Sequence, residues 1–345
     1  MFNYEQRPNA SERTDRLATA AIVTVSAAVS VGIAWASMTQ LKTYGWTLFL
    51  AVPTLAGFMP VALLRLRGRR SFGRCFLVSW LTGLTALAAL LLWGLEGLLC
   101  IFMAIPVMLP FQLLGTALAH FLFHRQRVRP SLGGAGAAAI VLGLATWESR
   151  NPRAADVFNT ADSIVVRATE GRIWSELVGM KAIPPPRGWL LGTGMACPRT
   201  VRIARGEPGG LRVCTLSTGV LVERISIWSP GHRLRWTALA TPPPLKEVNP
   251  FAHADPPHLH GFYEAIQGEF VLEWIGPSRT RLTRRTWYRH NLQPALYWRL
   301  WCDLAATQVH GVVLQEIKRL AERPVAMAPR DDPSTKSDPS GRVKS

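Results

Sequence analysis

Cysteine is scarce in this sequence: it holds five in 345 residues, with no CxxC pair and no Cys/His spacing typical of a zinc motif. Neither a disulfide framework nor a structural zinc site is therefore indicated. The sequence also lacks a recognisable motif for a catalytic nucleophile, a metal or a cofactor. We therefore predict no cofactor, no bound metal and no catalytic residue, and we favour a class other than enzymes.

Acidic residues are few as well, since 22 Asp and Glu stand against 39 Lys and Arg, for a formal net charge of +17. Such an excess is typical of proteins that bind nucleic acid. Here, however, much of it lies in short loops that flank long apolar segments, where it is first a signal of membrane topology. We predict a membrane as a partner and no nucleic acid.

Long apolar segments dominate residues 17–147. They have about the length that a helix needs to cross a bilayer, roughly 20 residues. We predict five spans, which are Leu17–Met38, Trp46–Leu64, Cys75–Gly94, Leu98–Phe123 and Ser131–Trp147. The fifth is the shortest, and the alternative that it lies only at the membrane interface stays open.

Basic residues alternate in number from loop to loop. The tail 1–16 and the loops 65–74 and 124–130 hold three, five and three Lys or Arg, against one and none in the two intervening loops. The positive-inside rule predicts a cytoplasmic N-terminus in a multi-pass inner (plasma) membrane protein. With five spans the C-terminal domain is periplasmic or otherwise extracytoplasmic; without the fifth it is cytoplasmic.

The sequence changes character after the spans. We expect a polar linker over 148–162, a globular domain over 163–322 and a disordered tail over 323–345, which is rich in Pro, Ser, Asp and Lys. Runs of strand-like composition alternate with Gly- and Pro-containing turns. The predicted strands are Ser163–Ala168, Met195–Ala204, Leu211–Leu216, Val220–Trp228, Arg233–Ala240, Tyr263–Ile275 and Arg279–His290, with a short helix over Thr169–Met180.

A long helix over Gln293–Glu322 is predicted to close the domain. Apolar residues recur along it at helical spacing, which predicts one buried face. That face comprises Tyr297, Trp301, Leu304, Ala305, Val309, Val312, Val313, Ile317 and Leu320, while Arg299, Asp303, Thr307 and His310 are predicted to stay in water. A long helix laid across a curved antiparallel sheet leaves a groove, and we expect function there.

This order of a strand, a short helix, antiparallel strands and one closing helix resembles the helix-grip fold of the START-like (SRPBCC) superfamily, the polyketide cyclase and lipid-transport group. The segments that carry the resemblance are SIVVRATEGRIWSELVGM, LRVCTLSTGVLVERISIWSPGHRLRW, GEFVLEWIGPSRTRLTRRTWYR and the terminal helix. The whole chain is similar to membrane-anchored bacterial members with a GLEGLLC-like hairpin. The resemblance implies an N-terminal α-helical transmembrane bundle, then an α+β helix-grip domain with a hydrophobic cavity between sheet and helix.

Two strands joined by a turn near Ser217 bring the first candidate residues together. If Leu216 pairs with Gly219, then Arg212 faces Glu223 on an apolar side of the sheet, where a carboxylate needs a partner. The pair is either a polar anchor for a ligand, with Glu223 able to act as an acid or base, or a structural ion pair.

The connection between residues 240 and 263 offers His253, Asp255, His258 and His260 in a short span. Their spacing matches no familiar metal signature. The prolines around them are equally typical of a stiff loop over the mouth of a cavity. We therefore predict a lid or rim here, with His258 as a ligand-binding residue.

Large aromatic residues supply much of any core, but some are expected to line the cavity. The predicted ones are Tyr263, Phe270, Trp287, Tyr297 and Trp301. The arginines between residues 279 and 289 are interpreted as a solvated outer face, and Glu96 as exposed at the membrane interface.

Together these patterns predict a membrane-anchored binding or carrier protein for a hydrophobic small molecule or lipid. One alternative is an enzyme of the cyclase or dehydratase type that uses the same cavity. Another is a non-catalytic subunit with a membrane-protein partner, which the small residues of the fifth span favour.

Overall fold

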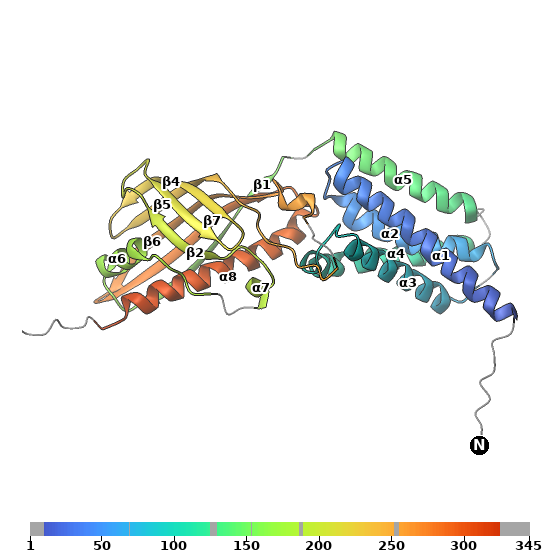
Figure 1. Cartoon of the computed structure of the whole chain (residues 1–345), viewed down its shortest axis with the longest axis horizontal. Helices are drawn as coiled ribbons and strands as arrows, with labels where there is room; N and C mark the ends of the chain where they lie inside the picture. Colours follow the sequence, from blue (N-terminus) through green and yellow to red (C-terminus); the bar gives the residue numbers. More distant parts are fainter. Residues whose placement is uncertain are drawn as a thin grey trace, which may run out of the picture.

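The structure is a computed structural model that describes residues 10–68, 70–124, 130–152, 154–185, 189–251 and 255–324. The molecule is elongated, and its two halves meet end to end (Figure 1). The first part of the chain forms a helical bundle, and the second part forms a curved sheet with a long helix along it.

Apolar helices form the bundle. They are α1 (Ala10–Trp35), which a π-helical turn extends to Gln40; α2 (Val52–Arg65), which a π-helical turn precedes from Thr47; α3 (Phe72–Leu92); α4 (Leu98–His124); and α5 (Pro130–Arg150). Within the described residues, five helices are long and apolar enough to cross a membrane. They correspond to the five predicted segments.

Helices α2 and α4 approach each other closely because each carries a glycine at the contact. A Cβ on Gly57 would stand 2.0 Å from the carbonyl oxygen of Gln112, and one on Gly115 would stand 1.9 Å from that of Thr54. The Ser79 hydroxyl of α3 donates to the Gly57 carbonyl at 2.9 Å. Small residues and hydroxyl groups at such contacts are typical of helix association in membranes.

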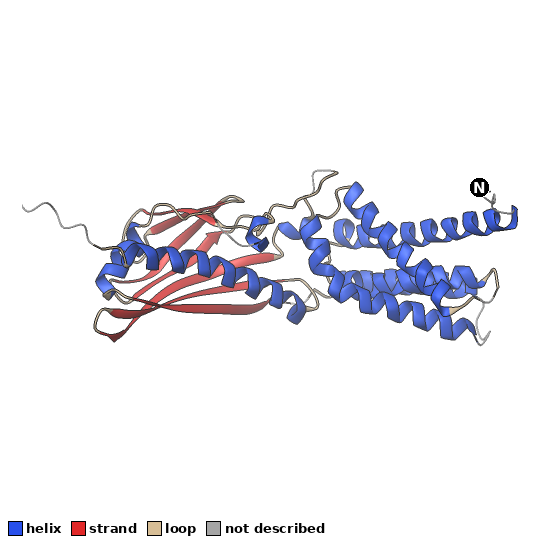
Figure 2. Ribbon diagram, turned by 90° about the horizontal axis from the view of Figure 1, so that it is seen from below, coloured by secondary structure: helices blue, strands red, loops and turns tan. Residues whose placement is uncertain are grey.

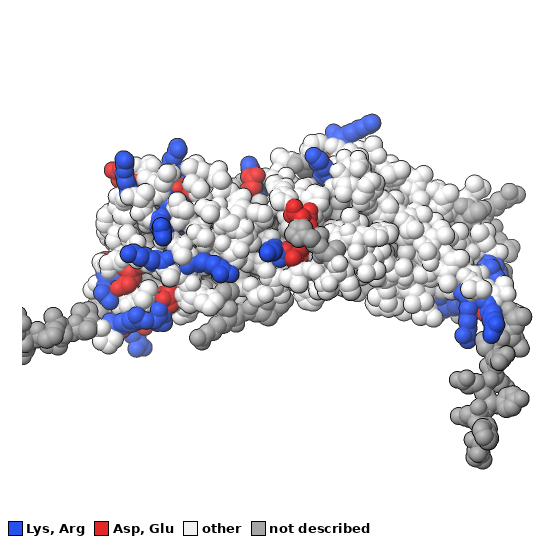
Figure 3. Space-filling view, in the orientation of Figure 1, with Lys and Arg blue, Asp and Glu red and all other residues white. Residues whose placement is uncertain are grey.

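The two ends of the bundle differ in charge. At the end far from the sheet, Asp15 near the start of α1 pairs with Arg70 at 3.1 Å and with Arg74. Basic side chains gather at this end in Figure 3, and the surface between this end and the middle of the molecule shows few charges. The opposite end contacts the second half, where the backbone N–H of Gln293 donates to the Tyr44 carbonyl at 2.9 Å.

One antiparallel sheet, in the order β1-β7-β6-β5-β4-β3-β2, forms the second half. Its strands are β1 (Asp156–Val166), β2 (Pro198–Ile203), β3 (Leu211–Leu216), β4 (Val220–Ser229), β5 (Arg233–Ala240), β6 (Tyr263–Gly276) and β7 (Arg279–His290). The helices are α6 (Glu170–Gly179), α7 (Trp189–Gly192) and α8 (Ala295–Ala321), and α8 runs along the sheet (Figure 2). The predicted fold class, a helical N-terminal segment followed by a curved antiparallel sheet around a C-terminal helix, is confirmed.

The predicted polar linker 148–162 differs from the structure. Helix α5 continues to Arg150, and β1 already begins at Asp156, seven residues before the predicted strand. The whole of β1 pairs with β7, from Asp156 opposite His290 to Val166 opposite Thr280. The sequence DVFNTAD has no long apolar run, so its strand conformation depends on this tertiary pairing rather than on local propensity. Helix α7 was not predicted either.

The buried face of helix α8 is rotated about the helix axis relative to the predicted one. Val313 and Ile317 are buried as predicted, but Leu304 is 39% exposed, and His310, which was predicted to stay in water, is only 1% exposed. Leu314 and Ala321, outside the predicted stripe, are buried with them in the core beneath the far end of the sheet.

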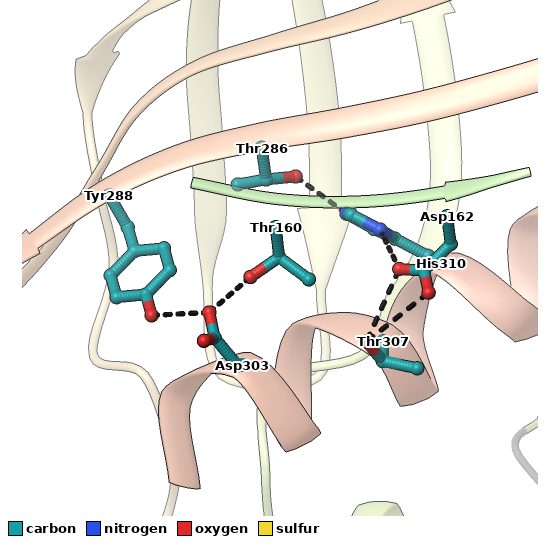
Figure 4. Close-up of polar contacts among 7 residues, drawn as sticks. All are labelled: Thr160, Asp162, Thr286, Tyr288, Asp303, Thr307 and His310. Carbon is teal, nitrogen blue, oxygen red and sulfur yellow. Dashed lines mark hydrogen bonds and ion pairs between the residues drawn. The ribbon is translucent and has the colours of Figure 1, made fainter. Parts of the chain in front are cut away.

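A layer of polar contacts between α8, β1 and β7 explains this rotation (Figure 4). Asp303 accepts hydrogen bonds from Thr160 of β1 and, at 2.6 Å, from the buried Tyr288 hydroxyl of β7. His310 Nδ1 lies 2.6 Å from a carboxylate oxygen of Asp162. Polar groups that find partners can be buried, so the predicted wet side of the helix faces β1 instead.

Candidate functional site

A cavity of about 260 Å³ lies between the sheet, helix α8 and the adjoining end of the bundle. Both halves of the molecule form its wall. The lining residues from the bundle and its turns are Met38, Tyr44, Leu48, Phe49, Leu87, Leu90, Glu96, Cys100, Ile101, Met103, Ala104 and Met108. Those from α8 are Trp298, Trp301, Cys302, Ala305, Ala306, Val309, His310 and Val313, and the sheet and its connections supply the rest.

Small side chains keep this space open. Ala305 and Ala306 face it from α8, and Ala265 and Gly268 face it from β6. A Cβ on Gly268 would stand 2.5 Å from the Trp236 ring, so this glycine lets the indole lie close against the strand. Because apolar cavities with a few polar groups are the usual small-molecule sites, this cavity is the candidate functional site.

Three charged residues in the cavity wall come from strands β3, β4 and β7 of the sheet. Arg212 of β3 forms a buried ion pair with Glu223 of β4, and its guanidinium lies 4.1 Å from the centre of the Trp236 ring. Arg284 of β7 lies over the Phe270 ring at 5.5 Å. Two guanidinium groups against one carboxylate leave an excess of positive charge in this part of the wall.

Burial changes the ionisation of these groups. Burial raises the pKa of Glu223 above its ordinary value, and the Arg212 charge opposes this shift. Burial and the neighbouring Arg212 lower the pKa of Arg284 to about 10, so it remains charged at neutral pH. Its Nε has no hydrogen-bond partner among the described residues. A buried N–H without a partner suits an acceptor on a bound ligand.

The strand register that was predicted for Arg212 and Glu223 is present. The Leu216 N–H donates to the Gly219 carbonyl at 2.8 Å, and Arg212 stands opposite Glu223 in the ladder between β3 and β4. Period-two alternation around a short turn was enough to predict this contact.

The other predicted site residues separate into two groups. His258, Tyr263 and Trp301 line the cavity. Phe270 is buried in the core below Arg284, whereas Tyr297 donates its hydroxyl to the Met103 carbonyl of α4.

Trp287 belongs to the outer face of β7. Its ring lies against the guanidinium groups of Arg235 at 5.3 Å and Arg285 at 5.5 Å. It alternates with Arg284 and Tyr288, which point inward, so the strand period turns it away from the cavity. The cavity therefore does not include Trp287.

Arg284, Trp298 and Glu96 are among the wall residues that the sequence did not predict. Arg284 was interpreted as solvated with its neighbours, although it has the same parity on β7 as the buried Leu282 and Tyr288. Trp298 lines the cavity and is 5% exposed. Glu96, predicted to be exposed at the membrane interface, is 8% exposed because the connection between β5 and β6 covers it.

The described histidines of the connection between β5 and β6 do not converge with Asp255 on one point, as a metal site within this connection would require. Asp255 and His260 form an exposed pair at 2.8 Å, whereas His258 points inward to the cavity. His253 lies outside the described residues. His258 instead meets Glu96, Cys100 and Glu247 at the end of the cavity that adjoins the bundle.

No protein-family model and no curated protein matches the sequence. Solved structures with a similar fold include the norcoclaurine synthase of Thalictrum flavum, with 11% identity over 50% of this chain and 98% of that chain (TM-score 0.34). The Zhui aromatase/cyclase of Streptomyces sp. R1128 has 13% identity over 48% and 95% of the two chains (TM-score 0.31).

A START superfamily protein of Mycobacterium smegmatis has 10% identity over 47% of this chain and 98% of that chain (TM-score 0.32). These likenesses concern the C-terminal half and its fold alone. The strand order, the antiparallel ladders and the long C-terminal helix define the fold of this half directly. The C-terminal half of this chain therefore has a helix-grip fold, a curved antiparallel sheet along a long C-terminal helix, as the sequence predicted.

Proposed function

We propose that this protein is a membrane-anchored binding or carrier protein for a hydrophobic small molecule or lipid. One observation carries the proposal: the cavity of the helix-grip half continues onto the end of the apolar bundle, so both halves form one wall. A ligand that partitions into a bilayer is most concentrated beside such a wall. Burial of its apolar surface would supply the binding free energy.

The charged residues of the wall give the ligand an orientation. In the part of the wall that the sheet forms, Arg212 and Arg284 outnumber Glu223, which favours a ligand with a polar or anionic group at that end. The carboxylate of Glu223 is already engaged by Arg212. This favours binding over a role for Glu223 as a general base, which needs access to the proton it removes.

The experiment compares two substitutions on α8 in the full-length protein. Ala306→Phe places a ring in the cavity, whereas Leu300→Phe enlarges a side chain that is 68% exposed on the same helix. Both proteins are purified in mild detergent, and their bound compounds are extracted and identified by mass spectrometry.

We expect hydrophobic compounds to copurify with the wild type and with Leu300→Phe, and to be depleted at least tenfold in Ala306→Phe, since filling the cavity removes their volume. Equal amounts in all three proteins would contradict binding in this cavity.

A further inference from the structure

Four side chains with metal-binding atoms meet where the two halves join. Glu96 lies in the turn before α4, Cys100 in the first turn of α4, and Glu247 and His258 in the connection between β5 and β6. One donor atom from each residue lies within 4.8 Å of the others. We propose that Glu96, Cys100, Glu247 and His258 bind a zinc ion.

These groups are buried without the partners that their chemistry requires. Glu96, Glu247 and His258 are 8%, 8% and 9% exposed. Across the described residues, Glu96 Oε2, both carboxylate oxygens of Glu247 and His258 Nδ1 have no hydrogen-bond partner. Burying carboxylates in this state is costly. A cation between them would remove that cost.

The existing contact is one that a metal can replace. His258 Nε2 lies 3.0 Å from the Cys100 sulfur, and His258 Nδ1 lies 3.7 Å from Glu96 Oε1.

The backbone around the four residues is fixed in position. The Leu98 N–H donates to the Val248 carbonyl at 3.0 Å, and the Asn249 amide donates to the carbonyls of Leu91 at 2.8 Å and Glu96 at 3.0 Å. These bonds hold the connection between β5 and β6 against the turn before α4.

Gly97 leaves the space that Glu247 occupies. A Cβ at this position would stand 1.8 Å from Glu247 Oε2, so any side chain here would displace the carboxylate. The Tyr44 ring lies edge-on against the His258 ring, with centroids 4.8 Å apart, and limits its rotation. The donors are therefore held by their surroundings before a metal arrives.

The donor types select the metal. Magnesium and calcium prefer shells made of oxygen, which a thiol and an imidazole do not provide. Zinc accepts sulfur, nitrogen and carboxylate oxygen in a four-coordinate site, at distances of roughly 2.0–2.3 Å. Two carboxylates, one thiolate and one imidazole meet that description. Cobalt(II) adopts the same geometry with lower affinity, and it serves below as a spectroscopic probe.

Such an ion would belong to the wall of the cavity. Glu96, Cys100 and His258 line the cavity, and Glu247 stands behind them. The ion would also cross-link the connection between β5 and β6 to the bundle. This inference does not depend on the proposed ligand binding, because its test measures the metal itself.

The first test is the metal content of the full-length protein, purified without chelators and then dialysed with zinc. We expect close to one zinc per chain in the wild type. Loss of a residue that only hydrogen-bonds a metal ligand typically lowers metal affinity by roughly 10- to 100-fold. Cys100→Ser and His258→Gln remove a ligand itself, so they should lower zinc affinity by more than this.

Cys75→Ser, at a cysteine buried elsewhere in the bundle, and His260→Gln, at an exposed histidine, are the matched controls and should retain the metal. Cobalt(II) added to the metal-free protein should produce a sulfur-to-cobalt absorption band that Cys100→Ser lacks and Cys75→Ser keeps. A folded wild type that binds no zinc, or equal zinc in Cys100→Ser, would overturn the proposal.

The second test uses Glu247→Gln, which removes the charge of the side chain and keeps its shape. If no metal binds, this change relieves a buried unpaired carboxylate and raises the melting temperature with or without zinc. If zinc binds, the wild type gains thermal stability on zinc addition and Glu247→Gln gains less. Equal gains in the two proteins would argue against coordination by Glu247 and overturn the four-residue site.

Discussion

The ion pair of Arg212 and Glu223 is held in an apolar wall, where each charge depends on the other. Both side chains are nearly inaccessible to solvent, and Trp236 covers the guanidinium. Removing one member of a buried pair leaves an uncompensated charge, which typically costs about 3–5 kcal/mol. The loss of either residue is therefore expected to destabilise the fold, although both are also part of the cavity wall.

We predict that Arg212→Met lowers the melting temperature of the full-length protein at pH 7 and that part of the loss returns as the pH falls toward 5. Burial raises the folded-state pKa of Glu223, and the variant lacks the positive charge that opposes this shift. A raised folded-state pKa means that the folded form binds the proton more tightly, so stability is present at low pH and lost as pH rises.

Thermal unfolding of both proteins between pH 5 and 8 measures this effect. Arg281→Met, which removes one member of an exposed pair with Glu273, is the control and should change little at any pH. If the melting temperatures of Arg212→Met and wild type differ by the same amount at every pH in this range, the prediction is wrong.

The contrast between Arg212 and Arg284 indicates what a sequence reveals about single residues. Arg212 was found because its alternation partner, Glu223, lay across a short turn in an apolar strand. Arg284 lies among other arginines, and only its parity with Leu282 and Tyr288 distinguishes it. The cluster around Glu247 combines segments that lie about 150 residues apart in the sequence. No local sequence pattern predicts a contact between segments so far apart.

At the scale of elements, local signals predicted most strands and the closing helix, and tertiary contacts decided the rest. Strands β3, β5 and β7 begin and end at the predicted residues. Strand β1 was predicted too short because its first half is held by β7. The rotation of α8 was misjudged because Asp303 and His310 find partners on β1 that periodicity alone does not reveal.

This rotation changes which tryptophan anchors the helix. Trp298 is 5% exposed and packs against Phe49 of the bundle, with ring centroids 4.8 Å apart. Trp301, which the sequence favoured, lines the same cavity but is only partly buried. A partly exposed side chain has fewer packing contacts to lose.

We predict that Trp298→Ala destabilises the protein by about 3–5 kcal/mol, the usual range for a buried large aromatic residue, and that Trp301→Ala costs less. Melting temperatures of the two variants and of Leu300→Ala, an exposed position on the same helix, provide the comparison. The opposite order of the two tryptophans would contradict the orientation of α8.

The charge distribution and the arrangement of the two halves favour the same orientation of the protein in the membrane. The basic loop 65–74 pairs with the start of α1 at one end of the bundle, and the helix-grip half docks at the other (Figures 1 and 3). Under the positive-inside rule the basic end faces the cytoplasm. We therefore propose that the helix-grip half lies on the opposite, extracytoplasmic side.

Reporter fusions check this orientation. A reporter inserted at Gly68, in the basic loop, and one fused after Arg150, at the end of α5, should report opposite compartments. Activity in the same compartment would show that α5 does not cross the membrane, and the helix-grip half would then be cytoplasmic.

The shared wall of the cavity also has a kinetic consequence. A ligand in this cavity would contact both halves, and contacts such as that of Tyr297 with Met103 hold the joint between them. Movements of whole domains typically take microseconds to milliseconds. We therefore propose that a substitution in the joint would speed exchange of the ligand without touching it.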